Sequence, residues 1–197
     1  MKPETIIFIG PQGSGKGTQI AKLAGALRAA DPTRRVVDIQ TGRRFRALAA
    51  KEENFTEKSV AGTIDTGAFQ PLFLSVVLWG DAFLHHASPD CHLLIDGFPR
   101  TVEEAIVLET ALAFYERANV TIFFLDVSEE LVRQRMKLRA RKDDTDEAIE
   151  VRLRDYREKT LPVVTYYESR TNTRTIHVDA TRGIEDIASD IKKHLGL

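Results

Sequence analysis

A chain of 197 residues, of which 43% are hydrophobic and 29% charged, can bury one good core but is too short for two full domains. Its net charge of −1 argues against a general attraction to nucleic acids or membranes, so any basic surface must be local. The single cysteine excludes an internal disulfide and a multi-cysteine zinc site. No apolar signal segment opens the sequence, which leads us to expect a cytoplasmic protein.

Short apolar runs alternate with stretches in which apolar residues recur at helical spacing, such as Ile20, Leu23 and Leu27. This alternation predicts a three-layer α/β fold, in which helices cover both faces of a parallel sheet and ligands bind beyond the carboxyl ends of the strands. Residues 40–70 lack a strand and predict a small inserted lobe. The five predicted strands are Thr5–Ile9, Arg35–Ile39, His92–Ile95, Val120–Asp126 and Thr175–Val178.

A glycine-rich segment follows the first predicted strand. Its glycines let the backbone curl so that several N–H groups point into one concavity, and a helix that begins near Lys16 adds the positive end of its dipole. Lys16 brings a mobile charge for the β- and γ-phosphates, and Thr18 a hydroxyl for a phosphate or for the water shell of Mg²⁺. Gly17 stands where the general P-loop pattern has Ser or Thr. The segment predicts a polyphosphate site built by Gly13, Ser14, Gly15, Lys16, Gly17 and Thr18.

A second motif, Asp96-Gly97-Phe98-Pro99-Arg100, follows the third predicted strand. In a P-loop fold, an Asp at such a strand end can hold the water shell of Mg²⁺. The planar guanidinium of Arg100 offers a fork of donors to a phosphate. The two motifs therefore predict neighbouring parts of one phosphate-handling site.

Together the two motifs resemble those of the adenylate kinase family of nucleoside monophosphate kinases. The P-loop of that family reads G-x-P-G-x-G-K-G-T-Q, which Gly10 to Gln19 match except at Pro11-Gln12, and its D-G-[FY]-P-R matches outright. The resemblance extends over essentially the whole chain. It implies a single P-loop kinase domain over residues 1–197, monomeric and dependent on Mg²⁺, whose partners are ATP and a nucleoside monophosphate rather than a nucleic acid or a membrane.

The acceptor side of the site is implied by further similarities. The family motif S-T-G-D-x-x-R corresponds to Gln40 to Arg46, with Arg43 in place of an acidic residue, and residues 67–71 resemble the segment that packs on the acceptor base. The resemblance implies that the monophosphate is bound by Thr41, Arg46, Ala68, Phe69, Gln70, Gly97, Phe98, Arg100, Glu104, Arg141 and Arg152.

The basic stretch after residue 132 resembles the arginine set that flanks and follows the lid of the family. Arg135 matches the position packed on the ATP base, and Arg141 and Arg152 match positions that bind the phosphates in transfer. Such charges suit phosphoryl transfer, which needs in-line positioning and neutralisation of charge but no general base when the acceptor is itself an anion. The implied catalytic residues are Lys16, Arg100, Arg135, Arg141 and Arg152, with Asp96 holding Mg²⁺ through water.

The lid is expected to be minimal. Only three residues separate Arg139 from Asp143, so a lid at about residues 137–144 has no room for a long domain or a zinc cluster. Asp144 with Glu147 fits a helix N-cap followed by an acidic first turn.

Glu104 departs from the family, which usually has Gln four residues after the arginine of D-G-F-P-R. A Gln amide both accepts from the adenine amino group and donates to the adjacent ring nitrogen, whereas a carboxylate only accepts and suits the two adjacent donors of guanine. Two interpretations stay open. Either Glu104 reads the base and relaxes or shifts selectivity, or it turns to solvent or simply places negative charge in a first helical turn.

The leading expectation is therefore the reaction ATP + AMP ⇌ 2 ADP. One alternative is a kinase of another monophosphate, such as GMP, UMP or CMP. Another is a nucleotide-binding regulatory protein that turns over poorly. The arginine set argues against the regulatory protein, because binding ATP alone needs few arginines.

Overall fold

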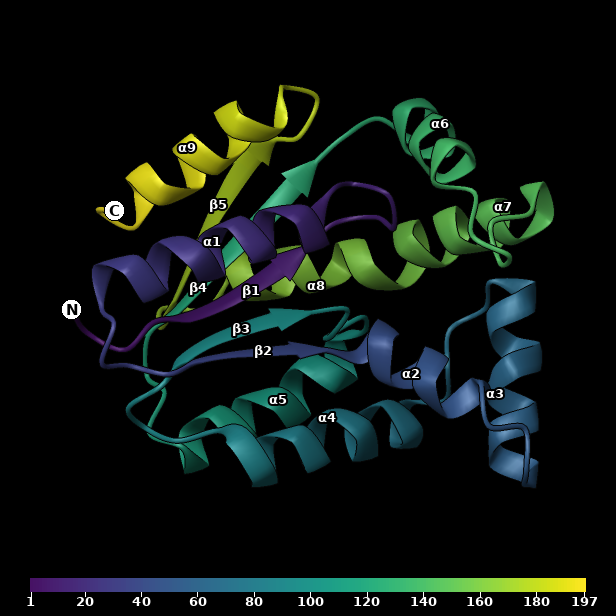
Figure 1. The fold of residues 1–197 in the computed structure, drawn as a ribbon, viewed down its shortest axis with the longest axis horizontal. Helices are drawn as coiled ribbons and strands as arrows, with labels where there is room; N and C mark the ends of the chain where they lie inside the picture. The colour runs from purple at the N-terminus through teal and green to yellow at the C-terminus, as the bar shows by residue number, and fades with distance from the viewer.

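A single parallel sheet forms the centre of the molecule in the computed structural model, which describes all 197 residues (Figure 1). The strand order is β2-β3-β1-β4-β5, and every neighbouring pair is parallel. The α/β prediction is confirmed, and each strand lies within two residues of its predicted bounds. The strands are β1 (Thr5–Ile9), β2 (Val36–Gln40), β3 (His92–Asp96), β4 (Val120–Asp126) and β5 (Thr173–Asp179).

Helices cover both faces of the sheet. One face carries α1 (Lys16–Ala30) and α9 (Ile184–His194), and the other carries α4 (Leu72–His86), α5 (Val102–Phe114) and α8 (Leu161–Glu168) (Figure 1). The sequence requires two covered faces, because the strands are apolar at consecutive positions and consecutive side chains point to opposite sides.

Strand β1 shows this two-sided burial most clearly. Its residues Ile6 and Phe8 pack in the core with α1 and α9, whereas Ile7 and Ile9 pack in the core with α4, α5 and α8. All four side chains are at most 2% exposed. The sheet is thus the shared wall of two apolar cores.

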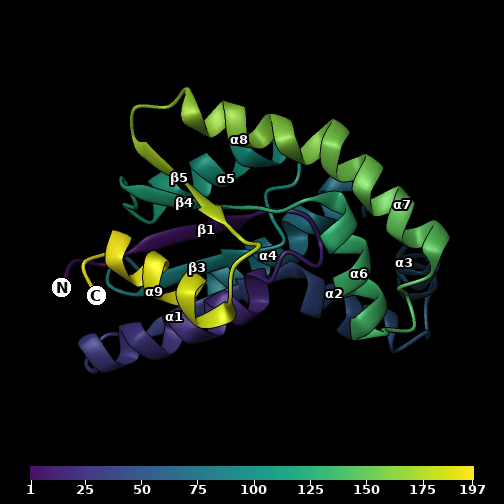
Figure 2. The ribbon, with the colours of Figure 1, turned by 90° about the horizontal axis from the view of Figure 1, so that it is seen from above.

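The remaining helices lie beyond the carboxyl ends of the strands. Helices α2 (Thr41–Ala49) and α3 (Phe55–Thr66) follow β2, and α6 (Glu129–Arg139) and α7 (Asp146–Asp155) follow β4 (Figures 1 and 2). A π-helical turn at Tyr156–Thr160 joins α7 to α8. These segments border the edge of the sheet at which the predicted site lies.

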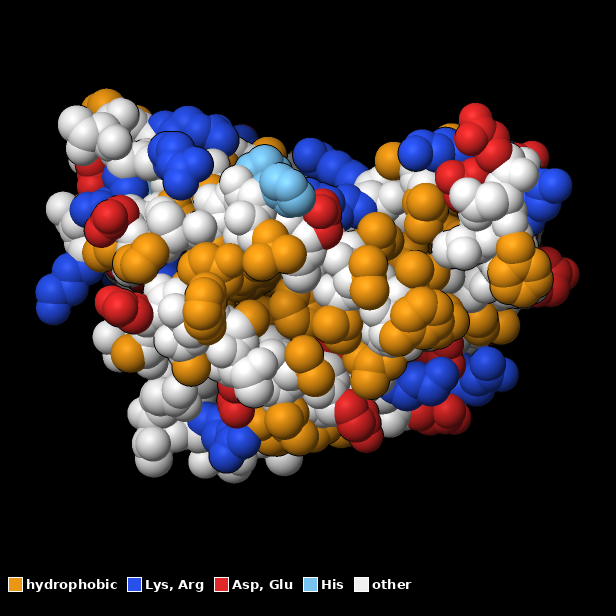
Figure 3. Space-filling model, turned by 90° about the horizontal axis from the view of Figure 1, so that it is seen from below, with side chains coloured by type: hydrophobic (Ala, Val, Ile, Leu, Met, Phe, Trp, Pro, Cys, Tyr) orange, Lys and Arg blue, Asp and Glu red, His pale blue; other side chains and the backbone are white.

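The outer surface of α4 and α5 is notably apolar (Figure 3). Phe73, Val77 and Leu84 of α4 and Ile106 and Phe114 of α5 are all exposed. None of them lines the cleft described below. No helix combines the length and the hydropathy needed to cross a bilayer.

One buried side chain, Arg117, ties the amino ends of the central strands together. Its guanidinium donates to the hydroxyl of Thr5 at 2.8 Å and to the carbonyl oxygens of Glu4 and Cys91 at 2.8 and 2.6 Å. It also donates to the carbonyl of Pro89 at 2.7 Å. Burial lowers the pKa of Arg117, and these carbonyl acceptors replace the water that the charge has lost.

We expect Arg117→Ala to lower the free energy of unfolding by about 3 kcal/mol, because several buried carbonyl oxygens would lose their donor. Urea denaturation measures this change. Arg28→Ala is the matched control, since Arg28 is exposed on α1, and should change stability by less than about 0.5 kcal/mol. Equal stability of the two variants would contradict the role assigned to Arg117.

Candidate active site

The loop between β1 and α1 has a backbone that only glycine can follow at its centre. Gly13 has φ of +94°, and a Cβ there would lie 3.0 Å from Cγ of Met136 and 3.2 Å from the carbonyl oxygen of Val132. Gly15 precedes α1 in the left-handed conformation and makes no side-chain cap. The first N–H groups of α1 are therefore left for an external acceptor, and the helix dipole favours an anion.

Lys16 lies across this loop. Its Nζ donates to the carbonyl oxygens of Gly10 and Pro11 at 2.8 and 2.9 Å. Burial lowers the pKa of Lys16 to about 8, although the nearby negative charge of Asp96 acts in the opposite direction. The ammonium thus rests on two neutral acceptors, which a phosphate would outcompete.

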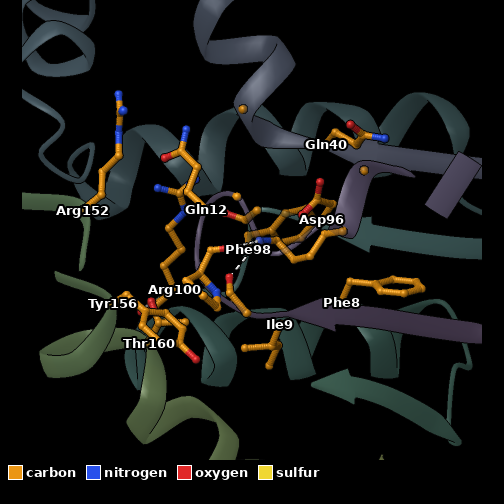
Figure 4. A pocket seen from close by; sticks show the side chains of 18 of the residues that line it. Phe8, Ile9, Gln12, Gln40, Asp96, Phe98, Arg100, Arg152, Tyr156 and Thr160 are labelled. Atoms are coloured by element: carbon orange, nitrogen blue, oxygen red, sulfur yellow. Dashed lines mark hydrogen bonds between the residues drawn. The ribbon is translucent and has the colours of Figure 1, made fainter. Parts of the chain in front are cut away.

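A cleft of about 470 Å³ opens at the carboxyl ends of the strands. In Figure 4, Arg100, Tyr156 and Thr160 lie on one side of it and Asp96 and Gln40 on the other. The predicted residues that line this one cleft are Gly13, Gly15, Lys16, Gly17, Thr18, Arg46, Phe69, Asp96, Gly97, Phe98, Arg100, Arg135, Arg141 and Arg152.

The charge of the cleft is strongly one-sided. Eight of its lining residues are Lys or Arg, and Asp96 is the only acid among them. Burial lowers the pKa of Arg46 and of Arg141, and the positive charges of neighbouring arginines lower both further. A multivalent anion is the ligand that such a cleft fits.

Some of the lining arginines keep donors free for a ligand. Arg100 uses its Nε to donate to the carbonyl of Gly97 at 2.8 Å, and its guanidinium lies over the ring of Phe69, 4.9 Å from the centroid. Arg135 is held by the carbonyl of Ala180 at 2.9 Å. These contacts fix each guanidinium on one side and leave the remaining N–H groups for phosphate or base.

Other arginines are paired with acids. Arg139 makes a two-pronged contact with Asp144 at 2.9 and 2.6 Å. Arg152, only 7% exposed, donates to Asp143 at 2.6 Å and to Asp144 at 3.0 Å. The prediction that Asp144 caps a helix is wrong, because Thr145 is the N-cap of α7 and the Asp144 carboxylate is occupied by the two arginines.

The structure places five predicted site residues outside the cleft lining, namely Ser14, Thr41, Ala68, Gln70 and Glu104. The hydroxyl groups of Ser14 and Thr41 are buried without a partner. The Gln70 amide donates to the carbonyl of Val60 at 3.3 Å. Glu104 is 3% exposed and meets three protein donors, so it faces neither the solvent nor the cleft.

Sequence reasoning missed Tyr156 and Thr160, which line the cleft from the π-helical turn. The hydroxyl of Thr160 donates to the carbonyl oxygen of Arg100 at 3.1 Å. No motif signals these residues, because the turn depends on hydrogen bonds between residues five apart. Arg43 and Arg139 also line the cleft, although neither is among the predicted site residues. Arg43 lies in the segment that resembles the monophosphate motif, and Arg139 lies in the predicted lid.

Known proteins are similar to this chain over most of its length. A family model described as "Adenylate kinase" matches residues 8–172. An adenylate kinase of Corynebacterium urealyticum is 34% identical over 183 residues, which cover 93% of this chain and 94% of that protein. "Adenylate kinase 1" of a Nostoc species is 34% identical over 191 residues, which cover 97% of this chain and 98% of that protein. An adenylate kinase of Corynebacterium aurimucosum is 37% identical over 166 residues, which cover 82% of this chain and 84% of that protein. The chain belongs to the adenylate kinase family of phosphotransferases.

Proposed function

We propose that this protein transfers a phosphoryl group from ATP to AMP in the reaction ATP + AMP ⇌ 2 ADP. One observation carries the proposal: the P-loop lysine shares a single cleft with arginines from separate segments, including Arg46 of α2, Arg100 after β3 and Arg141 after α6. Binding ATP alone would leave most of these donors unused. A second anionic nucleotide accounts for them.

The proposed mechanism is electrostatic. The N–H groups at the start of α1 and the Lys16 ammonium hold the ATP phosphates, with Arg135 at the side of the ATP base. Arg46 and Arg100 hold the acceptor phosphate, whose oxygen attacks in line. Arg141 and Arg152 stabilise the charge that spreads over the transferring group. The acceptor oxygen carries no proton that must be removed, so no general base is part of the proposal.

The proposal includes Mg²⁺ as cofactor. Asp96, the one acid of the cleft, would hold its water shell, and Thr18 lines the same cleft. No group of three His, Cys, Asp or Glu side chains could hold a metal ion by itself. Such a site fits Mg²⁺, which is bound mainly by phosphate oxygens and water and neutralises charge on the β- and γ-phosphates.

We further propose that residues 40–70 are the monophosphate lobe and residues 137–144 the lid. In support, α2 and α3 share a small apolar core around Phe45 and Val60, and α3 reaches α7 closely. A Cβ on Gly67 would lie 2.4 Å from the carbonyl oxygen of Ala148. The proposal is of a monomer in the cytoplasm, where both nucleotides are supplied.

We expect Lys16→Ala and Arg100→Ala each to lower turnover at least about a hundredfold, because each removes a charge that stabilises the transition state. A coupled assay of ADP formation measures the rate, and the thermal unfolding midpoint reports that the fold is intact. Arg133→Ala is the control. This side chain pairs with Glu129 and Glu150 at the surface, so its loss should be nearly silent. Near-wild-type turnover of either active-site variant would refute the assignment.

A compound that joins two adenosines through five phosphates should stabilise the protein against heat far more than ATP does. It would fill both nucleotide sides at once, and the second half binds at a high effective concentration. Thermal shift assays at matched concentrations compare the two ligands. Stabilisation no greater than that by ATP would exclude a site for two nucleotides.

ATP binding should take up protons near pH 8. The ammonium of Lys16 has a pKa of about 8 in the free protein, and bound phosphate favours the charged form. ATP affinity therefore falls as pH rises through about 8, where the free lysine becomes neutral. Calorimetric titration in two buffers of different ionisation enthalpy measures the uptake. Lys16→Met should abolish it, and equal uptake by that variant would assign the protons elsewhere.

A further inference from the structure

The buried carboxylate of Glu104 contacts three donors from two other segments. Its Oε1 accepts from the hydroxyl of Ser75 at 2.5 Å and from the indole N–H of Trp79 at 3.2 Å, both on α4. Its Oε2 accepts from the backbone N–H of Arg100 at 2.7 Å. The side chain is 3% exposed and does not line the cleft. Both oxygens are therefore engaged inside the protein.

These contacts explain why the chain has Glu at this position. The indole N–H and the backbone N–H can only donate, and they meet different oxygens of Glu104. A carboxylate accepts on both sides. A glutamine would turn its NH₂ group against one of the two donors, which costs a hydrogen bond and adds repulsion.

These contacts fix the position of the Arg100 backbone. Its backbone N–H is held by Glu104, and its carbonyl oxygen accepts from Thr160 at 3.1 Å. Trp79, held by the same carboxylate, stacks on Phe98 with ring centroids 5.3 Å apart and planes 3° apart. The segment that carries Arg100 is thus fixed from α4, from α5 and from the π-helical turn.

We propose that Glu104 is a positioning residue for phosphoryl transfer, which holds the Arg100 backbone so that its guanidinium meets the phosphates, and that it does not read the acceptor base. The proposal rests on the proposed function. In-line transfer is sensitive to a displacement of about 1 Å, so a loosened Arg100 lowers kcat. Discrimination between bases stays unchanged, since no atom of Glu104 faces the cleft.

The test begins with Glu104→Gln and its matched control Glu103→Gln, which alters an exposed acid one residue away on α5. With ATP and AMP, we expect Glu104→Gln to lower kcat by about tenfold or more and to leave KM for ATP within about twofold. The AMP:GMP ratio of kcat/KM should also stay within about twofold. Glu103→Gln should behave as wild type in all three measurements.

A double variant separates positioning from general damage. Trp79→Phe removes the indole N–H that would oppose the new amide, so Trp79→Phe combined with Glu104→Gln should raise kcat about threefold or more above Glu104→Gln alone. If the two substitutions acted independently, their reductions in kcat would multiply, and the double variant would have a lower kcat than Glu104→Gln alone. A double variant no faster than Glu104→Gln overturns the coupled arrangement.

Further outcomes are equally decisive. A raised AMP:GMP ratio with unchanged kcat in Glu104→Gln would show a base contact and overturn the proposal. If that variant does not fold, Thr160→Val decides, because it releases the Arg100 carbonyl without changing the side-chain shape. Its kcat should fall about fivefold at unchanged selectivity, and an unchanged kcat overturns the proposal. A wild-type protein inactive with ATP and AMP would refute the proposed function instead.

Discussion

Repulsion between positive charges is the constraint on which the site depends. Eight basic residues line one cleft with a single acid, and the fold must hold their charges close together in the absence of a ligand. It does so by anchoring side chains to fixed acceptors: Arg100 to the carbonyl of Gly97, Arg135 to that of Ala180, and Arg139 and Arg152 to Asp144. The repulsion destabilises the ligand-free protein. Phosphates that neutralise these charges remove the repulsion, which strengthens their binding.

The parallel sheet makes this gathering possible. Strands β1 and β3 are neighbours, and Phe8 pairs with Asp96 in their register. The two loops that follow these strands therefore leave the sheet side by side, which brings the P-loop next to the segment that carries Arg100. Strand order, rather than distance along the chain, decides which residues share the site.

Much of this was predictable because the signals are local. The strands are apolar runs bounded by turns and helices, and the P-loop and the Asp96 motif are short segments whose chemistry is set by their own residues. The direction of the Glu104 side chain was not predictable. A motif gives a position along the chain, but the donors that capture this carboxylate, Ser75 and Trp79, lie 29 and 25 residues away.

Arg117 and the π-helical turn escaped prediction for the same kind of reason. Arg117 belongs to none of the motifs in the sequence, and its acceptors include Thr5 and Glu4, which lie 112 and 113 residues away. The π-helical turn brings Thr160 to the lining of the cleft. The turn is a local change of helical pitch, and no residue pattern in the sequence predicts it.

The position of Arg117 also has a consequence for how this protein can diverge. It joins the amino ends of the strands, whereas the charged cleft lies at their carboxyl ends, with the length of the sheet between them. Substitutions at the two ends share no partners, so their energetic effects add. Substitutions in the cleft can therefore change nucleotide preference, whereas substitutions around Arg117 change thermal stability without altering the cleft.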